Sequence, residues 1–129
     1  MRIQLKGWRV KDLVLTAKQD GASSESNENK FQLSFGHALS QGNPREFVVG
    51  FKIGLNEAAF SLAVEMVFVF ETDSEIDEGF KDSPFMKINA PAIAFPYIRA
   101  YISNLTLQSG YDSVILPSVN FVSLTEADK

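Results

Sequence analysis

Two neighbouring strands are predicted by residues 46–70, which read EFVVGFKIGLNEAAFSLAVEMVFVF. Large apolar side chains fall on odd numbers from Phe47 to Leu55 and on even numbers from Phe60 to Phe70. Because successive side chains of a strand point to opposite faces, this period of two predicts strands that each have one apolar face. The four residues between them, 56–59, have the length of a hairpin loop. An antiparallel pair is therefore the centre of the expected fold.

A third, shorter strand is predicted upstream, where Phe31, Leu33 and Phe35 alternate with polar residues. The segment 36–44 that follows it is rich in turn-forming residues, and we expect it to be a loop. Polar segments flank the short strand on both sides. This arrangement favours a position at the edge of the sheet.

The N-terminal segment 3–17 is expected to form one long, bent strand. Its apolar phase slips near Gly7 and again near Asp12, which is typical of β-bulges. Residues 19–29 are polar and rich in serine. They predict a crossover loop between the long strand and the short one.

The last third of the chain changes to a spacing of three and four residues, which predicts one amphipathic helix. Its apolar positions are Ile98, Tyr101, Ile102 and Leu105. Pro96 suits the first turn of this helix, and Gly110 suits the left-handed residue just past its end. Extended connectors are expected on either side, at 90–92 and 114–118.

Strands followed by a helix, without a strand-helix repeat, predict an α+β fold. We expect a four-stranded antiparallel sheet packed on one main helix, in a single domain over residues 1–129. Cysteine is absent, which excludes disulfides and suits a reducing compartment. No segment resembles a secretory signal or has the length of a membrane span. The expected location is the cytoplasm, without membrane insertion.

The charge distribution bears on possible partners. The formal net charge is -4, and the basic residues are scattered singly along the chain. Phosphate binding needs clustered Lys and Arg, so nucleic acid is not an expected partner. Acidic residues gather in the segment 71–82, for which a solvated loop is the expected state. Binding of a hard metal ion is the alternative there, although the spacing does not match a calcium loop.

Groups that could carry catalysis are scarce. His37 is the only histidine, and it falls in the predicted loop 36–44. The chain has no cysteine for it to activate, no Gly-x-Ser-x-Gly elbow and no Gly-rich phosphate loop. We therefore expect no enzymatic activity, no cofactor and no metal site.

Apolar side chains are more abundant than one small core requires, with eleven phenylalanines in 129 residues. One helix covers only part of the predicted sheet, so the remaining apolar surface either forms an oligomer interface or stays open to apolar partners. An edge strand with three large apolar side chains is a liability unless it serves binding. The strand with Phe31, Leu33 and Phe35 is thus the best candidate surface for extended polypeptide.

Four short motifs resemble the SecB protein-export chaperones and occur in the order found in that family. They are Val10-Lys11-Asp12-Leu13, Phe95-Pro96-Tyr97-Ile98-Arg99, Gly110-Tyr111 and Pro117-Ser118-Val119-Asn120-Phe121. The resemblance implies an ATP-independent chaperone that assembles as a homodimer or homotetramer. It also implies that non-native preproteins are held in apolar grooves.

The resemblance assigns roles to individual residues by position. Client binding falls to the residues that match the family groove, namely Phe31, Leu33, Phe35, Phe121 and Leu124. Docking of the translocation ATPase SecA falls to acidic residues on the outer face of the sheet, where Asp12 and Glu65 match and Thr16 departs. The family's second helix continues beyond the Asn-Phe motif, whereas this sequence stops at Lys129. The resemblance therefore implies a truncated second helix and a shallower groove.

Two functions stay open on the sequence. The first is a SecB-like holdase, either general for exported proteins or dedicated to one client such as an antitoxin. The second is a SecB-like scaffold without general chaperone activity, whose apolar faces are permanently buried in an oligomer. Open side chains at Phe31, Leu33 and Phe35 would favour the holdase, and full burial would favour the scaffold.

Overall fold

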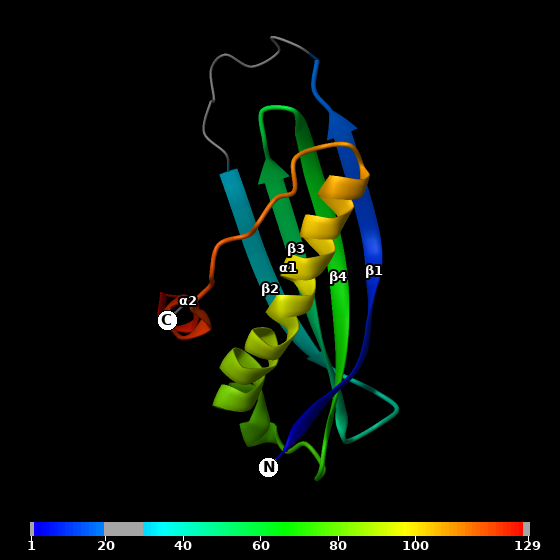
Figure 1. The fold of residues 1–129 in the computed structure, drawn as a ribbon. Helices are drawn as coiled ribbons and strands as arrows, with labels where there is room; N and C mark the ends of the chain where they lie inside the picture. Colours follow the sequence, from blue (N-terminus) through cyan, green and yellow to red (C-terminus); the bar gives the residue numbers. More distant parts are fainter. Residues whose placement is uncertain (1, 20–29, 128–129) are drawn as a thin grey trace.

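The computed structural model describes residues 2–19 and 30–127 of the chain. Its elements, in chain order, are β1 (Ile3–Ala17), β2 (Lys30–Leu39), β3 (Glu46–Asn56), β4 (Phe60–Thr72), the short 3-10 helix η1 (Glu78–Asp82), the π-helix η2 (Phe85–Asn89), α1 (Ala90–Gln108) and α2 (Phe121–Ala127). The four strands form one antiparallel sheet, and α1 runs along one face of it (Figure 1). The predicted α+β fold with one main helix is confirmed.

The order of strands across the sheet is β1-β4-β3-β2, which places β1 and β2 at the edges. The central β3 and β4 form the predicted hairpin, in which Phe51 pairs with Met66 and Leu55 with Leu62. Residues paired in register share a face of the sheet. The apolar side chains of both strands therefore gather on the face toward α1, where Phe51 and Met66 are completely buried.

The long strand β1 carries the two predicted bulges. Its pairing with β4 slips between Leu5 and Gly7 and again between Val10 and Asp12. Each extra residue reverses which of the following side chains face the core. Leu5, Val10 and Leu15 consequently all pack against the core although their numbers alternate between odd and even. The predicted crossover loop lies, apart from Gln19, outside the described residues.

Strand β2 is longer than predicted. It continues to Leu39, so the expected loop at 36–44 is wrong for its first four residues, and His37 is a strand residue paired with Val49. The alternation does continue through His37 and Leu39, but Gly36 and Ala38, which occupy the intervening positions, hid the pattern. The backbone reverses over the residues that follow, where the Ser40 N–H donates a hydrogen bond to the carbonyl of Glu46 at 3.1 Å.

Helix α1 begins earlier than predicted. It starts at Ala90 and continues from η2, so 90–92 is helical rather than extended, and Pro96 lies inside the helix rather than in its first turn. Pro91 takes the early position where a missing N–H is tolerated. Proline inside a helix is unfavourable, but Phe95 and Ile98 beside it are buried against the sheet. Tertiary packing therefore outweighs the local preference.

The end of α1 follows the prediction. Gly110 has a φ of 96°, the left-handed region that glycine enters without strain. The Tyr111 N–H donates to the carbonyl of Thr106 at 3.0 Å, and the Gly110 N–H to that of Leu107 at 3.2 Å. These bonds satisfy carbonyls that the helix end would otherwise leave open.

No helix in the described part of the chain is long and apolar enough to cross a bilayer.

Candidate functional site

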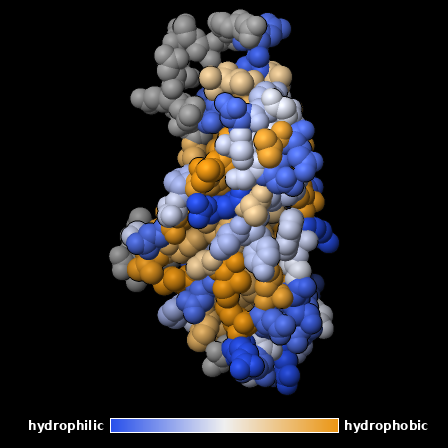
Figure 2. Space-filling model, viewed as in Figure 1, coloured by the Kyte–Doolittle hydropathy of each residue, from blue (hydrophilic) through white to orange (hydrophobic). Residues whose placement is uncertain are grey.

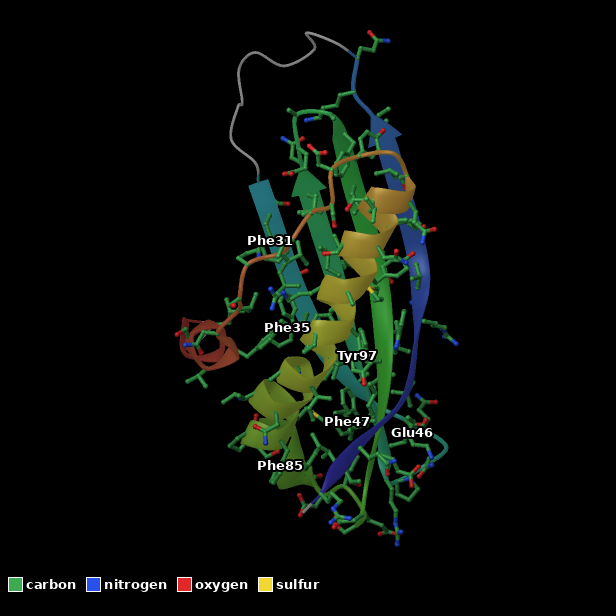
Figure 3. All side chains as sticks on the ribbon, in the orientation of Figure 1. Phe31, Phe35, Glu46, Phe47, Phe85 and Tyr97 are labelled. Carbon is green, nitrogen blue, oxygen red and sulfur yellow. The ribbon has the colours of Figure 1, made fainter. Side chains whose placement is uncertain are left out.

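The candidate site is built on the edge strand β2. Phe31, Leu33 and Phe35 pair with Leu55, Ile53 and Phe51 of β3, which places them on the face of the sheet that carries the core. All three are half-buried and pack against that core. Phe31 and Phe35 are labelled on β2 in Figure 3, and no further described strand covers this edge of the sheet. The predicted edge position is therefore correct.

A small groove opens where β2 meets residues 109–120, the segment between α1 and α2 that we call the connector. It has a volume of about 240 Å³, and we call it the edge groove; its lining is Phe31, Leu55, Glu57 and residues 114–117. Ile115 stands on its rim with 76% of its surface exposed, whereas the neighbouring Leu116 is buried in the core. Leu116 thus anchors the connector, and Ile115 offers an apolar side chain to solvent.

Hydroxyl groups of α1 and of the connector itself hold the connector to the helix. The buried Thr106 Oγ1 donates to the carbonyl of Ile102 at 2.9 Å and accepts the Val114 N–H at 3.0 Å. Ser103 Oγ donates to the carbonyl of Val114 at 2.6 Å, and Ser113 Oγ donates to the carbonyl of Ser103 at 3.0 Å. Both polar backbone groups of Val114 are thereby satisfied from the helix. These bonds fix one wall of the edge groove.

Helix α2 lies against the same edge strand. Its first residue, Phe121, is only 4% exposed and packs edge-on against Phe35 at 5.4 Å and against Phe95 at 5.8 Å between ring centroids. Asn120 caps the helix, because its Oδ1 accepts the Ser123 N–H at 3.1 Å. Leu124, one turn further on, is exposed.

The five predicted client-binding residues thus differ in their surroundings, and one of them, Leu33, is half-buried on β2. Phe35 and Phe121 lie together as an aromatic anchor between sheet and helix. Phe31 lines the edge groove, and Leu124 faces solvent. The sequence did not point to Ile115 or to Thr106. The only signal for Ile115 was an apolar residue in a segment without regular structure.

A second apolar surface involves the opposite edge of the sheet and the helix. Trp8 and Leu13 of β1 and Ile93 and Tyr97 of α1 are exposed although they are large and apolar, and Trp8 and Leu13 pair with Phe68 and Val64 on the face of the sheet that carries α1. Trp8 is held in place by stacking on Phe68, at 5.8 Å between ring centroids. Figure 2 shows apolar surface both along α1 and beside α2. Surface of this kind is typical of contacts between protein copies.

The predicted docking pair lies on the outer face of the sheet, away from the helices. Asp12 and Glu65 are cross-strand neighbours in the pairing of β1 with β4. Glu65 Oε2 forms an ion pair with Lys11 Nζ at 3.7 Å, and Lys52 of β3 is its other cross-strand neighbour. The acidic pair therefore lies among basic side chains.

The acidic segment 71–82 has structural contacts of its own. The Arg2 backbone N–H donates to Asp73 Oδ1 at 3.1 Å, and this bond lowers the pKa of the Asp73 carboxyl below its usual value. Asp77 Oδ1 accepts the Phe80 N–H at 3.0 Å and caps η1. Among the described residues, no group of three or more His, Cys, Asp or Glu side chains is placed to hold a metal ion.

Comparison with solved structures identifies the class of fold. A SecB-like chaperone of Mycobacterium tuberculosis, solved in complex with a ChAD peptide from the HigA1 antitoxin, matches with a TM-score of 0.65 at 19% identity, over 92% of this chain and 91% of that one. The sheet and its main helix therefore form a SecB-like fold. The whole chain, residues 1–129, also matches the family described as preprotein translocase subunit SecB. The chain belongs to the SecB family.

Relatives found by sequence comparison include a named SecB protein. An uncharacterized protein of Methanocaldococcus jannaschii is 33% identical over 91 residues, which are 66% of this chain and 57% of that protein. The protein-export protein SecB of Dinoroseobacter shibae is 28% identical over 87 residues, 62% of this chain and 49% of that protein. The matches span about half the length of these two curated relatives.

Proposed function

We propose that this chain is an ATP-independent holdase that binds non-native polypeptide in the cytoplasm through the edge groove and the apolar residues beside it. The observation that carries the proposal is the position of Phe31, which lines an open groove on β2, the edge strand of the described sheet, next to the exposed Ile115. Membership of the SecB family and the antitoxin peptide bound by the mycobacterial neighbour support it. The clients are exported preproteins or one dedicated protein such as an antitoxin.

The energetics favour many weak contacts over one strong contact. Burial of one large apolar side chain contributes roughly 1.5–3 kcal/mol. Micromolar binding needs about 8 kcal/mol in addition to the cost of association. A client must therefore engage several sites along β2 and the connector at once. Apolar contacts of this kind tolerate varied sequences and select for unfolded chains, which expose such residues.

The proposal is tested by suppression of aggregation of a chemically unfolded client. Phe31→Ser with Ile115→Ser removes the two groove residues that project from the core, and we expect this variant to lose most of the protection given by the native protein. The triple change of Phe31, Leu33 and Phe35 to Ser extends the test along β2. Leu107→Ser is the matched control, because Leu107 is 59% exposed on α1 outside the groove.

The results separate the two levels of the proposal. If the native protein protects nothing at stoichiometric amounts, the holdase function is wrong. If the double variant and the Leu107→Ser control protect equally well, only the placement of the groove is wrong. A shift in melting temperature identifies a variant that fails because it is unfolded.

The scaffold alternative rests on the second apolar surface, with Trp8, Leu13, Ile93 and Tyr97 exposed. In that function, assembly of a homodimer or homotetramer would bury the apolar faces permanently. Surface labelling distinguishes the two functions, because a holdase keeps Ile115 accessible in the assembled protein. A scaffold would protect it.

Docking of SecA through Asp12 and Glu65 is a finer part of the proposal. Glu65 is already paired with Lys11, which reduces the charge available to a basic partner. The double variant Asp12→Asn, Glu65→Gln tests the role directly, and we expect it to bind SecA at least fivefold more weakly than the native protein. Equal binding would remove these residues from the docking site and leave the holdase proposal intact.

A further inference from the structure

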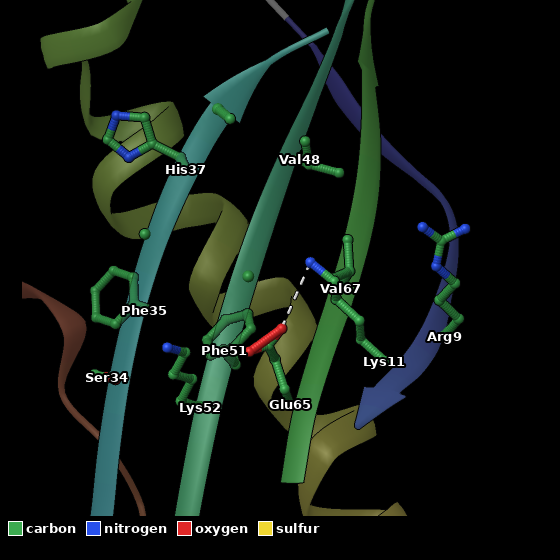
Figure 4. Close-up of a pocket in the computed structure, with 13 residues that line it drawn as sticks. Arg9, Lys11, Ser34, Phe35, His37, Val48, Phe51, Lys52, Glu65 and Val67 are labelled. Atoms are coloured by element: carbon green, nitrogen blue, oxygen red, sulfur yellow. Dashed lines mark ion pairs between the residues drawn. The ribbon is translucent and has the colours of Figure 1, made fainter. Parts of the chain in front are cut away.

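The outer face of the sheet carries a hollow that the holdase function does not use. Its volume is about 620 Å³, and we call it the outer hollow; residues that define it are Arg9, Lys11, Gly36, Gly50, Lys52 and Val67. In Figure 4 the hollow faces the viewer and α1 lies behind the sheet. Helices α1 and α2 pack on the other face of the sheet, where Phe95, Ile98 and Phe121 are buried in the core.

Glycines give the outer hollow its depth. Gly36 of β2 and Gly50 of β3 pair directly across the two strands. A Cβ atom added at either position would meet no other atom within 4 Å, so packing inside the chain does not require glycine there. Glycine inside a strand is unfavourable and often marks a place where another backbone approaches closely.

The charge of the outer hollow is opposite to that of the whole chain. Arg9, Lys11 and Lys52 line it together with one carboxylate, Glu65, whereas the chain has a net charge of -4. Lys11 pairs with Glu65 at 3.7 Å. Among the described residues, no carboxylate lies within ion-pairing distance of Arg9 or Lys52. Two cations are thus available to an anionic partner.

The hollow is elongated along the strands. A smaller hollow of about 320 Å³, lined by Gln32, Leu33, Ser34, Lys52, Ile53 and Gly54, adjoins it and shares Ser34 and Lys52 with it. Together they form a path along β2 and β3 with Lys52 in the middle. Phe51 faces the core and is completely buried, so it gives no stacking surface for a base. The shape and the small number of cations favour a polypeptide over a nucleic acid.

We propose that the outer hollow binds an acidic, extended segment of a partner polypeptide. Arg9 and Lys52 pair with its carboxylates, and Gly36 and Gly50 allow its backbone to approach the sheet. This role goes beyond the holdase, because it uses the opposite face of the sheet from the edge groove. Its chemistry is also opposite to docking on Asp12 and Glu65, which would attract a basic partner.

The test measures binding of a fluorescein-labelled decaglutamate peptide to the full chain by fluorescence anisotropy at low salt. Decaglutamate is extended at neutral pH because its charges repel one another. We expect Lys52→Glu and Arg9→Glu each to weaken binding about tenfold. Glu65→Gln should tighten binding, because it removes the one carboxylate of the hollow and releases Lys11. Added salt should weaken the binding of every variant.

Two matched controls separate the hollow from general effects. Lys6→Glu makes the same change of charge on β1 outside the hollow, and Gly7→Val makes the same change of shape as Gly50→Val at a glycine that also has open space around it. We expect Gly50→Val to lose peptide binding without a fall in melting temperature, and Gly7→Val to keep it. Phe31→Ser should also keep it, which separates this site from the edge groove.

Three results would overturn the proposal. The first is that decaglutamate does not bind the native chain at millimolar concentration. The second is that Lys6→Glu weakens binding as much as Lys52→Glu, which would show a response to net charge alone. The third is that a ten-residue oligothymidylate binds more tightly than the peptide, which would assign the hollow to nucleic acid.

Discussion

At the scale of single residues, one hydroxyl group determines where a wall of the edge groove lies. Thr106 links α1 to Val114 of the connector, and it is completely buried. The sequence does not reveal this role, because a threonine near the end of an amphipathic helix has the pattern of a surface residue. Its partner lies eight positions further on, and only the fold brings the two together.

Replacement of Thr106 by valine tests this role. The change keeps the shape of the side chain, removes every hydrogen bond of the hydroxyl group and leaves the Val114 N–H without its acceptor. We expect the free energy of unfolding, measured in urea, to fall by about 1–3 kcal/mol. Ser113→Ala is the control, because it removes an exposed hydroxyl of the same connector and should change stability by no more than about 0.5 kcal/mol. Equal losses in both variants would contradict the role.

Asp73 gives a prediction of pH dependence. The hydrogen bond from the Arg2 backbone N–H lowers the pKa of the Asp73 carboxyl below its ordinary value, so the bond favours the charged carboxylate in the folded state. Its contribution to stability is therefore present above the pKa of the unfolded chain and is lost as the pH falls through the lower pKa of the folded protein.

Comparison of the native protein with Asp73→Asn, by urea denaturation at pH values from 7 to 2, measures this contribution. The native protein should be slightly more stable near neutral pH, and the difference should disappear at the acidic end. A difference that grows on acidification would show that the carboxyl pKa is raised instead.

At the scale of elements, predictability depended on whether several signals agreed. In β3 and β4 the alternation, the hairpin loop and the expected burial all indicated the same structure, and each was confirmed. The start of α1 could not be predicted, because Pro96 favours a helix start and the burial of Phe95 beside it is known only from the fold. The end of β2 was not predicted correctly, because glycine, the residue type of Gly36, is typical of turns. Pairing with Gly50 nevertheless keeps Gly36 in the sheet.

Pro96→Ala tests whether tertiary packing outweighs the unfavourable local effect of proline inside α1. Pro96 is exposed, so the change removes a local defect of the helix and little packing. We expect the free energy of unfolding to rise by about 1–3 kcal/mol, somewhat offset by the greater freedom of the unfolded chain. Pro117→Ala, an exposed proline outside the helices, should give no such gain. A destabilised Pro96→Ala variant would show that the ring makes contacts that matter.

At the scale of the whole molecule, the candidate site could be predicted only in part. The alternation of Phe31, Leu33 and Phe35 identified the edge strand, and the family motif placed Phe121 close to it. Ile115 was not identified, because its position beside Phe31 depends on bonds between the connector and α1. A binding surface that combines distant segments becomes visible only when the fold places them side by side.

The second apolar surface leads to a prediction about assembly. Exposed Leu13 on β1 and Tyr97 on α1 are expected to be buried between copies of the chain. Light scattering should therefore give a mass two or four times that of one chain, and the double variant Leu13→Glu, Tyr97→Glu should have a smaller mass. A native protein that is strictly monomeric at micromolar concentration would contradict assembly through this surface.

The central claim is that the edge groove holds unfolded polypeptide. The chain has no cysteine, so Ile115→Cys provides a single attachment site for an environment-sensitive fluorophore such as acrylodan, and Leu107→Cys provides the matched control. On addition of an unfolded client, we expect a saturable blue shift of emission at position 115 and none at position 107. Equal shifts at both positions, or no shift at 115 while the client remains soluble, would contradict it.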